Sequence, residues 1–213
     1  MKNVKLLFLT LLSFVALTSC SSDDGENVNQ PSTPETPVLV FNGTIEMAHL
    51  KSQNADPKCF LNLTTGETYK LSQSAANAKN IDLVWGSRAS VPSQKYIVSP
   101  SDAFVFHTIG GSNDLWQDFD LFAGWNVRNT VKFDLFGKVG FENIVTNAQF
   151  DAYIEGESVF TEYLPFEGTQ DQLQLTYMFE TVHDDIRYIG VFKFTSANPN
   201  TRMANYTIKL RAN

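Results

Sequence analysis

The stretch CFLNLTTGETYKL, residues 59–71, places two short apolar runs on either side of the tetrapeptide TTGE at 64–67. Glycine adopts positive φ without a steric penalty, so Gly66 suits the short loop of a β-hairpin. The pattern therefore predicts two antiparallel strands joined by a tight turn.

Runs of the same kind occur on both sides of this hairpin. They are rich in β-branched and aromatic residues and are separated by Gly, Asn, Asp and Pro, which typically end strands. The segment His183-Asp184-Asp185 between two of these runs has the composition of a hairpin turn. The sequence predicts a mostly β fold: one antiparallel β-sandwich or open barrel with one or two short helices. The expected strands are 38–47, 81–87, 95–99, 103–109, 129–136, 174–182, 188–196 and 205–212.

Helical spacing is found in two segments. Residues 112–125 repeat apolar side chains at i, i+4 and i+7 after a candidate capping serine, and residues 147–156 place Phe150 and Ile154 on one face. We expect both helices to cover a face or an end of the sheets. Residues 72–80 suit a helical turn or a loop.

The first twenty residues have the three parts of a bacterial secretion signal: basic residues, an apolar stretch at 6–17 and small residues before Cys20. The apolar stretch is shorter than the roughly twenty residues that a membrane-spanning helix needs. The tetrapeptide LTSC at 17–20 resembles the lipobox of bacterial lipoproteins. The resemblance implies that residues 1–19 are a signal peptide and that Cys20 carries the lipid anchor.

Residues 20–37 have the composition of a disordered tether, because Ser, Asp, Asn, Pro and Thr dominate and almost nothing apolar can be buried. The acidic run directly after Cys20 resembles the export signal of surface lipoproteins in certain Gram-negative anaerobes. It implies display on the outer membrane, facing the medium. The alternative is a solvated linker on the periplasmic side. Residues 38–213 suit a single β-rich domain.

Charge excludes one class of partner. The chain has 16 basic and 23 acidic residues, and loss of Lys2 and Lys5 with the signal peptide would leave 14 against 23, a net charge of −9. A chain this acidic repels phosphate backbones, so we expect no nucleic-acid partner. Cys59 is expected to be a buried free thiol.

Four stretches together resemble the haemophore-like lipoproteins of the HmuY family and their surface-lipoprotein relatives. They are CFLNLTTGE at 59–67, IDLVW at 81–85, RYIGVFKFTSA at 187–197 and NYTIKLR at 205–211. The resemblance covers about half of the chain after Cys20, and Ile81-Asp82 stands where the family usually has Trp-Asp. It implies haem as a ligand, and an outer-membrane transporter is a further candidate partner.

Haem iron is held by His or Met side chains in an apolar pocket. His107 is the best candidate, because the strand 103–109 would carry it among apolar neighbours. The alternative is a histidine hydrogen-bonded at a sheet surface. We expect His183 to be a solvated turn residue and Met178 to belong to the core. The other candidates are His49, Met47 and Met203.

A glycan site needs aromatic platforms with carboxylates and amides beside them. Residues 113–126 have this composition, because two tryptophans stand among the polar residues Asn113, Asp114, Asp118, Asp120 and Asn126. The candidate ligands are Trp116, Trp125, Asp118 and Asp120. The alternative is an amphipathic helix with its aspartates in water. The aspartate spacing does not fit a calcium loop, so no metal site is predicted.

Enzymatic motifs with defined spacing, such as a nucleophile elbow or a phosphate-binding loop, do not occur in the sequence. The sequence predicts an outer-membrane surface lipoprotein that acts as a non-catalytic binding module for a small nutrient. The resemblance favours haem slightly, and a glycan is the alternative. A structural or adhesive surface protein is a third hypothesis.

Overall fold

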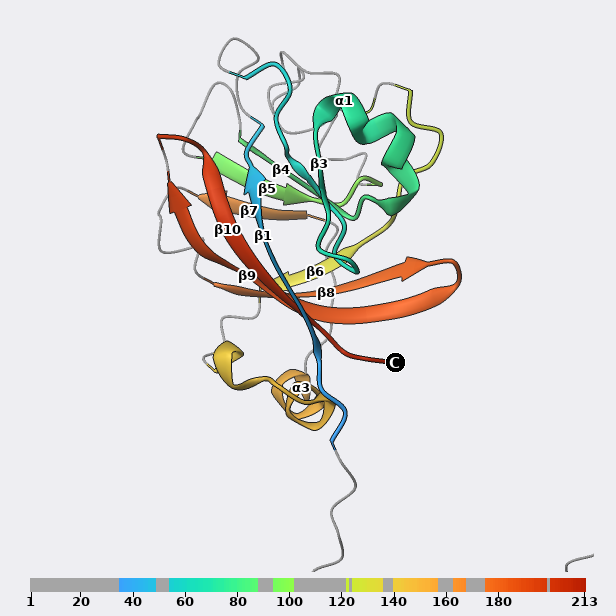
Figure 1. Cartoon of the computed structure of the whole chain (residues 1–213), viewed down its shortest axis with the longest axis vertical. Coiled ribbons are helices and arrows are strands. Elements are labelled where there is room, and N and C mark those ends of the chain that lie inside the picture. Colours follow the sequence, from blue (N-terminus) through green and yellow to red (C-terminus); the bar gives the residue numbers. More distant parts are fainter. Residues whose placement is uncertain are drawn as a thin grey trace, which may run out of the picture. The chain divides into compact units, whose positions relative to one another are not determined.

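The structure is a computed structural model, and it describes residues 35–48, 54–87, 94–101, 122, 124–135, 140–156, 163–167, 175–198 and 200–213. The chain divides into two units, Met1–Thr33 and Pro34–Asn213, and every described residue belongs to the second (Figure 1). The predicted signal peptide, Cys20 and the strand predicted at 103–109 lie outside the described residues. Among the described residues, no helix is both long enough and apolar enough to cross a membrane.

Ten described strands form two antiparallel sheets, which confirms the predicted mostly β, sandwich-like fold. The first sheet has the order β1-β10-β9-β8-β6 and the second the order β3-β2-β4-β5-β7. The strands of the first sheet are β1 Leu39–Glu46, β6 Lys132–Leu135, β8 Thr176–His183, β9 Ile186–Asn198 and β10 Met203–Leu210. Those of the second are β2 Phe60–Leu61, β3 Thr68–Tyr69, β4 Leu83–Ser87, β5 Gln94–Val98 and β7 Tyr163–Glu167. The helical elements are α1 Leu71–Ser74, η1 Ala75–Asn80, η2 Phe141–Asn143 and α3 Asn147–Ile154.

The hairpin predicted at 59–71 is confirmed. β2 and β3 pair antiparallel, and Gly66 has φ +72° in the turn between them. Asn62 stabilises this turn, because its side-chain oxygen accepts hydrogen bonds from the backbone of Thr64 and Thr65 at 2.8 and 3.0 Å. Tyr206 of β10 donates its hydroxyl to the Gly66 carbonyl at 2.7 Å, which fastens the turn to the first sheet.

The predicted turn between β8 and β9 is confirmed as well. His183 pairs with Ile186, and the two residues between them, Asp184 and Asp185, have φ of 49° and 64°. Positive φ at both central positions is the geometry that matches the right-handed twist of a two-residue hairpin.

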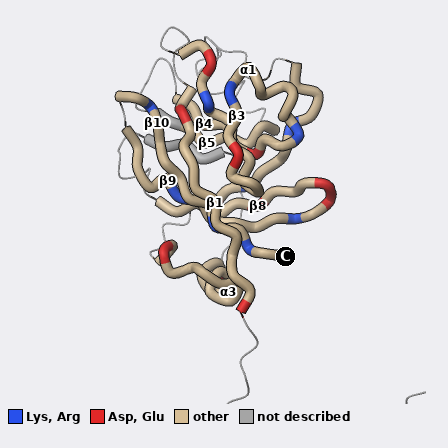
Figure 2. Tube along the Cα trace, viewed as in Figure 1, with Lys and Arg blue, Asp and Glu red and all other residues tan. Residues whose placement is uncertain are grey.

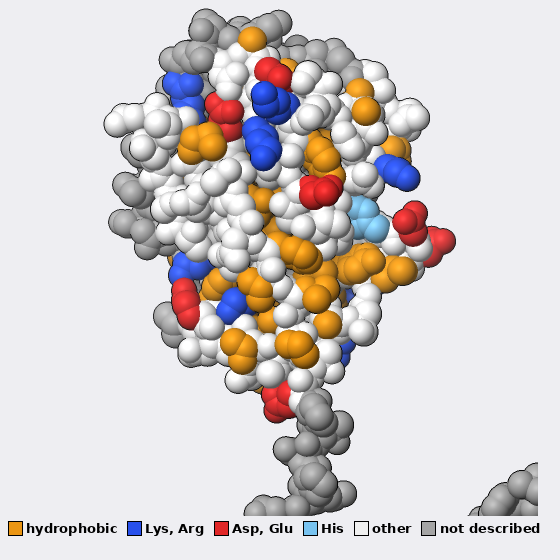
Figure 3. Space-filling model, viewed as in Figure 1, with side chains coloured by type: hydrophobic (Ala, Val, Ile, Leu, Met, Phe, Trp, Pro, Cys, Tyr) orange, Lys and Arg blue, Asp and Glu red, His pale blue; other side chains and the backbone are white. Residues whose placement is uncertain are grey.

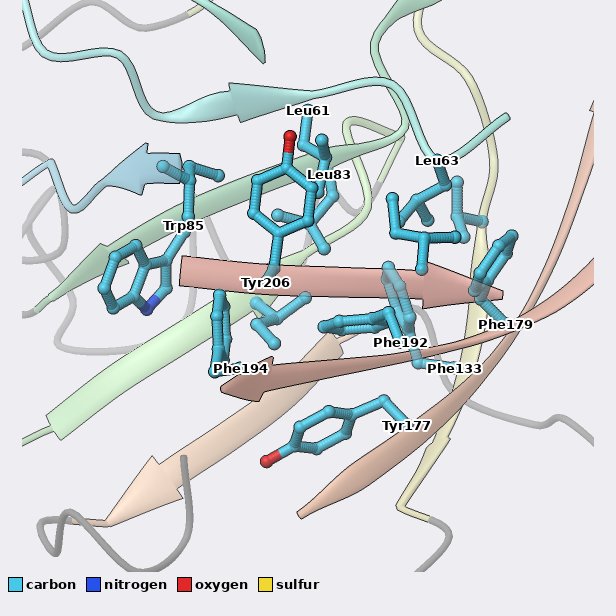
Figure 4. Packing of buried hydrophobic residues seen from close by; sticks show 14 of the residues in the cluster. Leu61, Leu63, Leu83, Trp85, Phe133, Tyr177, Phe179, Phe192, Phe194 and Tyr206 are labelled. Carbon is cyan, nitrogen blue, oxygen red and sulfur yellow. The ribbon is translucent and has the colours of Figure 1, made fainter. Parts of the chain in front are cut away.

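The main core lies between the two sheets and is rich in aromatic side chains (Figure 4). Phe192 is at its centre, with ring centroids 5.0 Å from Tyr177 and 6.2 Å from Phe133. Phe179 packs over Gly190 of β9, where an added Cβ would lie 2.2 Å from the ring. The backbone of β9 and this ring can come so close only because residue 190 has no side chain.

One strand was not predicted. β7 contains Pro165, and proline in a run argues against a strand because it donates no backbone hydrogen bond. Among the described strands, β7 lies at the edge of the second sheet and pairs only with β5. At an edge strand, the backbone N–H that Pro165 lacks need not pair with a neighbouring strand, so the proline destabilises the sheet little.

The helix predicted at 147–156 is confirmed as α3. Thr146 caps it and forms a reciprocal capping box with Gln149. A second core cluster joins this helix to the outer face of the first sheet, with Phe150 packed near Met178 and Val191.

The other predicted helix, 112–125, lies largely outside the described residues. Its described end is a turn, in which the Trp125 backbone N–H donates to the Phe122 carbonyl at 3.1 Å. Cys59 is buried and free, as predicted, and burial raises the pKa of its thiol well above the ordinary value.

Candidate ligand-binding site

Asp82 is a fully buried carboxylate between the two sheets. It directly precedes β4, and one of its oxygens accepts the Leu63 backbone N–H at 2.8 Å. Its other oxygen accepts the Thr181 hydroxyl at 2.9 Å and lies 2.7 Å from Nε2 of His183, both on β8. Because one oxygen binds the turn between β2 and β3 and the other binds β8 of the first sheet, the Asp82 side chain links the two sheets.

The His183 imidazole is enclosed by this contact, with 14% of its side chain exposed and the Tyr188 ring centroid 6.1 Å away. Burial by itself lowers the pKa of His183. The hydrogen bond and charge of Asp82, the charge of Asp184 and a hydrogen bond that His183 makes to the Lys79 backbone carbonyl outweigh burial and leave that pKa above 6.5. The prediction of a solvated turn residue is wrong for His183, because the fold brings a partner from the other sheet.

The residues considered as haem ligands are spread over the molecule. Met178 is buried near α3, as predicted for a core residue, and Met47 is buried between the sheets. Met203 is half-buried at the start of β10, and Nε2 of His183 is held by Asp82. His107 and His49 lie outside the described residues.

Trp125 is the one candidate glycan residue in the described part of the chain, since Trp116, Asp118 and Asp120 lie outside it. Its ring packs edge-on against Phe122 at 4.7 Å and is tilted against Phe60 at 5.6 Å. Its indole N–H donates to the Ser74 hydroxyl at 3.1 Å. The side chain is therefore partly buried and fixed in orientation, at the edge of the second sheet's outer cluster.

A shallow basin of about 360 Å³ lies beside Trp125, between η1 and the chain that follows the tryptophan. Alanine methyl groups and the exposed Val127 supply its apolar surface, and Lys79 and Asn126 supply polar groups. The six lining residues are Ala75, Ala76, Ala78, Lys79, Asn126 and Val127.

Asn129 holds the two walls of the basin together. Its side-chain amide donates to the carbonyls of Lys79 and Ile81 at 2.8 and 3.0 Å. With the bond from Trp125 to Ser74, this gives two anchors between η1 and residues 125–129, so the basin has fixed walls.

The sequence pattern pointed to Trp125 and to the lining residue Asn126, but not to the opposite wall of the basin. Ser74 and Lys79 lie about fifty residues away in the sequence, in the segment 72–80 that was predicted only as a helical turn or loop. Asp82 carried a sequence signal, an acidic residue within the apolar run IDLVW, although the signal does not reveal which residue it pairs with.

Comparison with known proteins identified a solved structure with a similar fold. No family profile and no curated protein matches the chain. The chain is similar in structure to a DUF4466 family protein from Parabacteroides merdae ATCC 43184, whose crystal structure was determined at 2.00 Å, with a TM-score of 0.53 and 14% sequence identity. The likeness covers 83% of this chain and 54% of that one, so the chain spans about half the length of its structural neighbour. The resemblance to the HmuY family stays a prediction.

Proposed function

We propose that this chain is a lipid-anchored surface protein of the outer membrane that binds a small hydroxylated ligand, a glycan fragment, without catalysing a reaction. The lipobox-like tetrapeptide at 17–20 supports the anchor, and the acidic run after Cys20 supports display at the cell surface. The single observation that supports a glycan as the ligand is the basin between η1 and the residues that follow Trp125.

The basin has the size and chemistry of a sugar subsite. Its volume of about 360 Å³ is near the lower end for small-molecule pockets, which fits one or two sugar rings. The Lys79 ammonium and the Asn126 amide can hydrogen-bond hydroxyl groups, while alanine methyl groups and Val127 can contact the apolar face of a ring. The walls are already fixed, so binding requires little ordering.

Haem fits this basin less well than a glycan. None of the six described lining residues is His, Met, Cys or Tyr, the side chains that hold haem iron. Nε2 of His183 is hydrogen-bonded to Asp82, so iron ligation there would break the contact between the sheets. Haem binding in the described part of the chain would therefore lack a free histidine, and it would depend on His107 or His49, which lie outside the described residues.

Tryptophan fluorescence tests the proposal, because Trp125 directly precedes the lining residues Asn126 and Val127, and Trp85 is buried in the core. We expect the full chain carrying Trp116→Phe to show altered emission when titrated with a panel of neutral and amino-sugar oligosaccharides. Lys79→Ala and Asn126→Ala should each raise the dissociation constant obtained from the titration about tenfold. That is the free energy of about one hydrogen bond made by a charged or amide group. Lys70→Ala is the matched control, since Lys70 is exposed and does not line the basin.

Two results would overturn the glycan ligand. One is the absence of any response across the panel. The other is a hemin titration that gives a shifted Soret band, unaffected by Lys79→Ala and lost in His107→Ala, which would establish haem as the ligand instead.

A further inference from the structure

Three of the six large apolar side chains that are exposed among the described residues surround the start of β1. They are Leu39, Val40 and Val145, which are 47, 49 and 55% exposed. We call these three residues the entry patch, because the chain enters the folded unit here.

Backbone contacts hold the patch together. The Val38 N–H donates to the Val145 carbonyl at 3.1 Å, and the Asn147 N–H donates to the Thr36 carbonyl at 2.8 Å. Residues 36–38 therefore run alongside 145–147. Val40 lies on the same face of β1 as Val38, and Leu39 lies on the opposite face, because side chains alternate along a strand.

Charges near the patch are largely compensated. Arg211 makes two hydrogen bonds to the Asp151 carboxylate, at 2.8 and 3.1 Å. The Lys209 ammonium is buried and donates to three backbone carbonyls, of Phe141, Glu142 and Ile144. Figure 2 shows charges of both signs near this end of the unit, and Figure 3 shows hydrophobic side chains gathered above the point where the chain enters.

We propose that the entry patch rests on the lipid surface of the membrane to which the chain is anchored. This inference depends on the lipid anchor at Cys20. Fourteen residues lie between Cys20 and Glu35, the first described residue, and a chain of that length reaches at most about 50 Å even when fully extended. The entry patch is the part of the folded unit that such a chain keeps nearest to the bilayer.

The tether explains why a patch of three side chains is enough to orient the folded unit on the membrane. Linking two partners by a short chain turns binding into an intramolecular step with an effective concentration on the order of millimolar. A few aliphatic side chains at the headgroup boundary then bias the orientation of the whole unit. A second copy of the chain is a poorer occupant, because three half-exposed side chains offer far less than the roughly 800 Å² per partner of a stable protein interface.

We expect the entry patch to contact zwitterionic lipid. Glu35 is exposed directly before the patch, and the Arg211 guanidinium is already paired with Asp151. The expected contact is therefore apolar and does not require anionic headgroups.

Spin labels on the full, lipidated chain test the inference in phosphatidylcholine vesicles. Val40→Cys and Val145→Cys place a label in the patch, and Val127→Cys is the matched control, a valine 42% exposed beside η1 at the other end of the unit (Figure 1). The buried Cys59 is shielded from the labelling reagent. We expect collisions with oxygen to exceed those with a polar nickel complex several-fold at positions 40 and 145, with the reverse at position 127.

Three outcomes would overturn the inference, and they differ from one another. If the chain floats with the vesicles and Cys20 carries acyl chains, but all three labels collide mainly with nickel, the patch does not touch lipid. If the patch labels broaden through spin–spin coupling, a second copy occupies the patch. If mass spectrometry finds no acyl chain on Cys20, the proposed anchor fails first and the inference falls with it.

Discussion

At the scale of single residues, the fold depends on positions where a side chain would be too large. Gly190 is buried in β9, and an added Cβ would lie within 2.2 to 3.0 Å of three atoms of the Phe179 ring. Phe179 is fully buried in the main core, so its ring has little room to move.

We therefore expect Gly190→Ala to lower the free energy of unfolding by about 2 to 3 kcal/mol, the usual cost of overpacking a core. Gly156→Ala is the matched control: Gly156 has φ +80° and open space around its Cβ position, so only backbone strain of about 1 kcal/mol is expected there. Urea denaturation of the two variants measures the difference. Equal losses would show that the Phe179 ring moves aside freely.

At the scale of elements, the long β8–β9 hairpin has a turn whose sequence is not optimal for its geometry. Asp184 and Asp185 both adopt positive φ, which is unfavourable for a residue with a side chain. Glycine or asparagine is preferred in such turns. The composition was sufficient to predict a turn, because Asp tolerates this conformation better than most residues.

Asp185→Gly should raise the free energy of unfolding by about 0.5 to 1 kcal/mol, because it relieves the positive φ while the glycine adds some freedom to the unfolded chain. Thermal unfolding of the variant should show a higher midpoint. The converse change, Gly66→Ala, should destabilise the β2–β3 turn, where φ is +72° and an added Cβ would lie 2.5 Å from Phe41. A lower midpoint for Asp185→Gly would contradict the assignment of strain to this turn.

At the scale of the whole molecule, the contact of Asp82 with Thr181 and His183 joins the second sheet to the first. Asp82 is fully buried, so its charge depends on these partners. When the His183 imidazole is protonated it forms an ion pair with Asp82, so the association of the sheets is sensitive to pH.

The pKa of His183 is raised in the folded state above the ordinary value of 6.5, so the folded protein binds more protons than the unfolded chain just above that pH. The stability that His183 contributes is thus fully present below pH 6.5 and is lost as the pH rises through the folded-state pKa. Free energies of unfolding measured across this range should fall with pH in the unaltered chain and change less in His183→Gln. A difference between the two proteins that grows with pH would refute this role.

The sequence by itself determined the predominance of β structure, most strands, both turns and the helix α3. These features depend on local patterns: the alternation of apolar residues, the turn residues and the capping of Thr146 with Gln149. Each can be read within a window of about ten residues, because the physical interactions that produce it act over that distance along the chain.

Tertiary structure alone decided the partners of the buried polar groups and the candidate site. Asp82 and His183 are 101 residues apart in the sequence, and Trp125 and Ser74 are 51 apart. Their pairing depends on the order and register of strands from two sheets, which no local pattern encodes. The same holds for β7, where Pro165 is tolerated because the fold puts that strand at an edge.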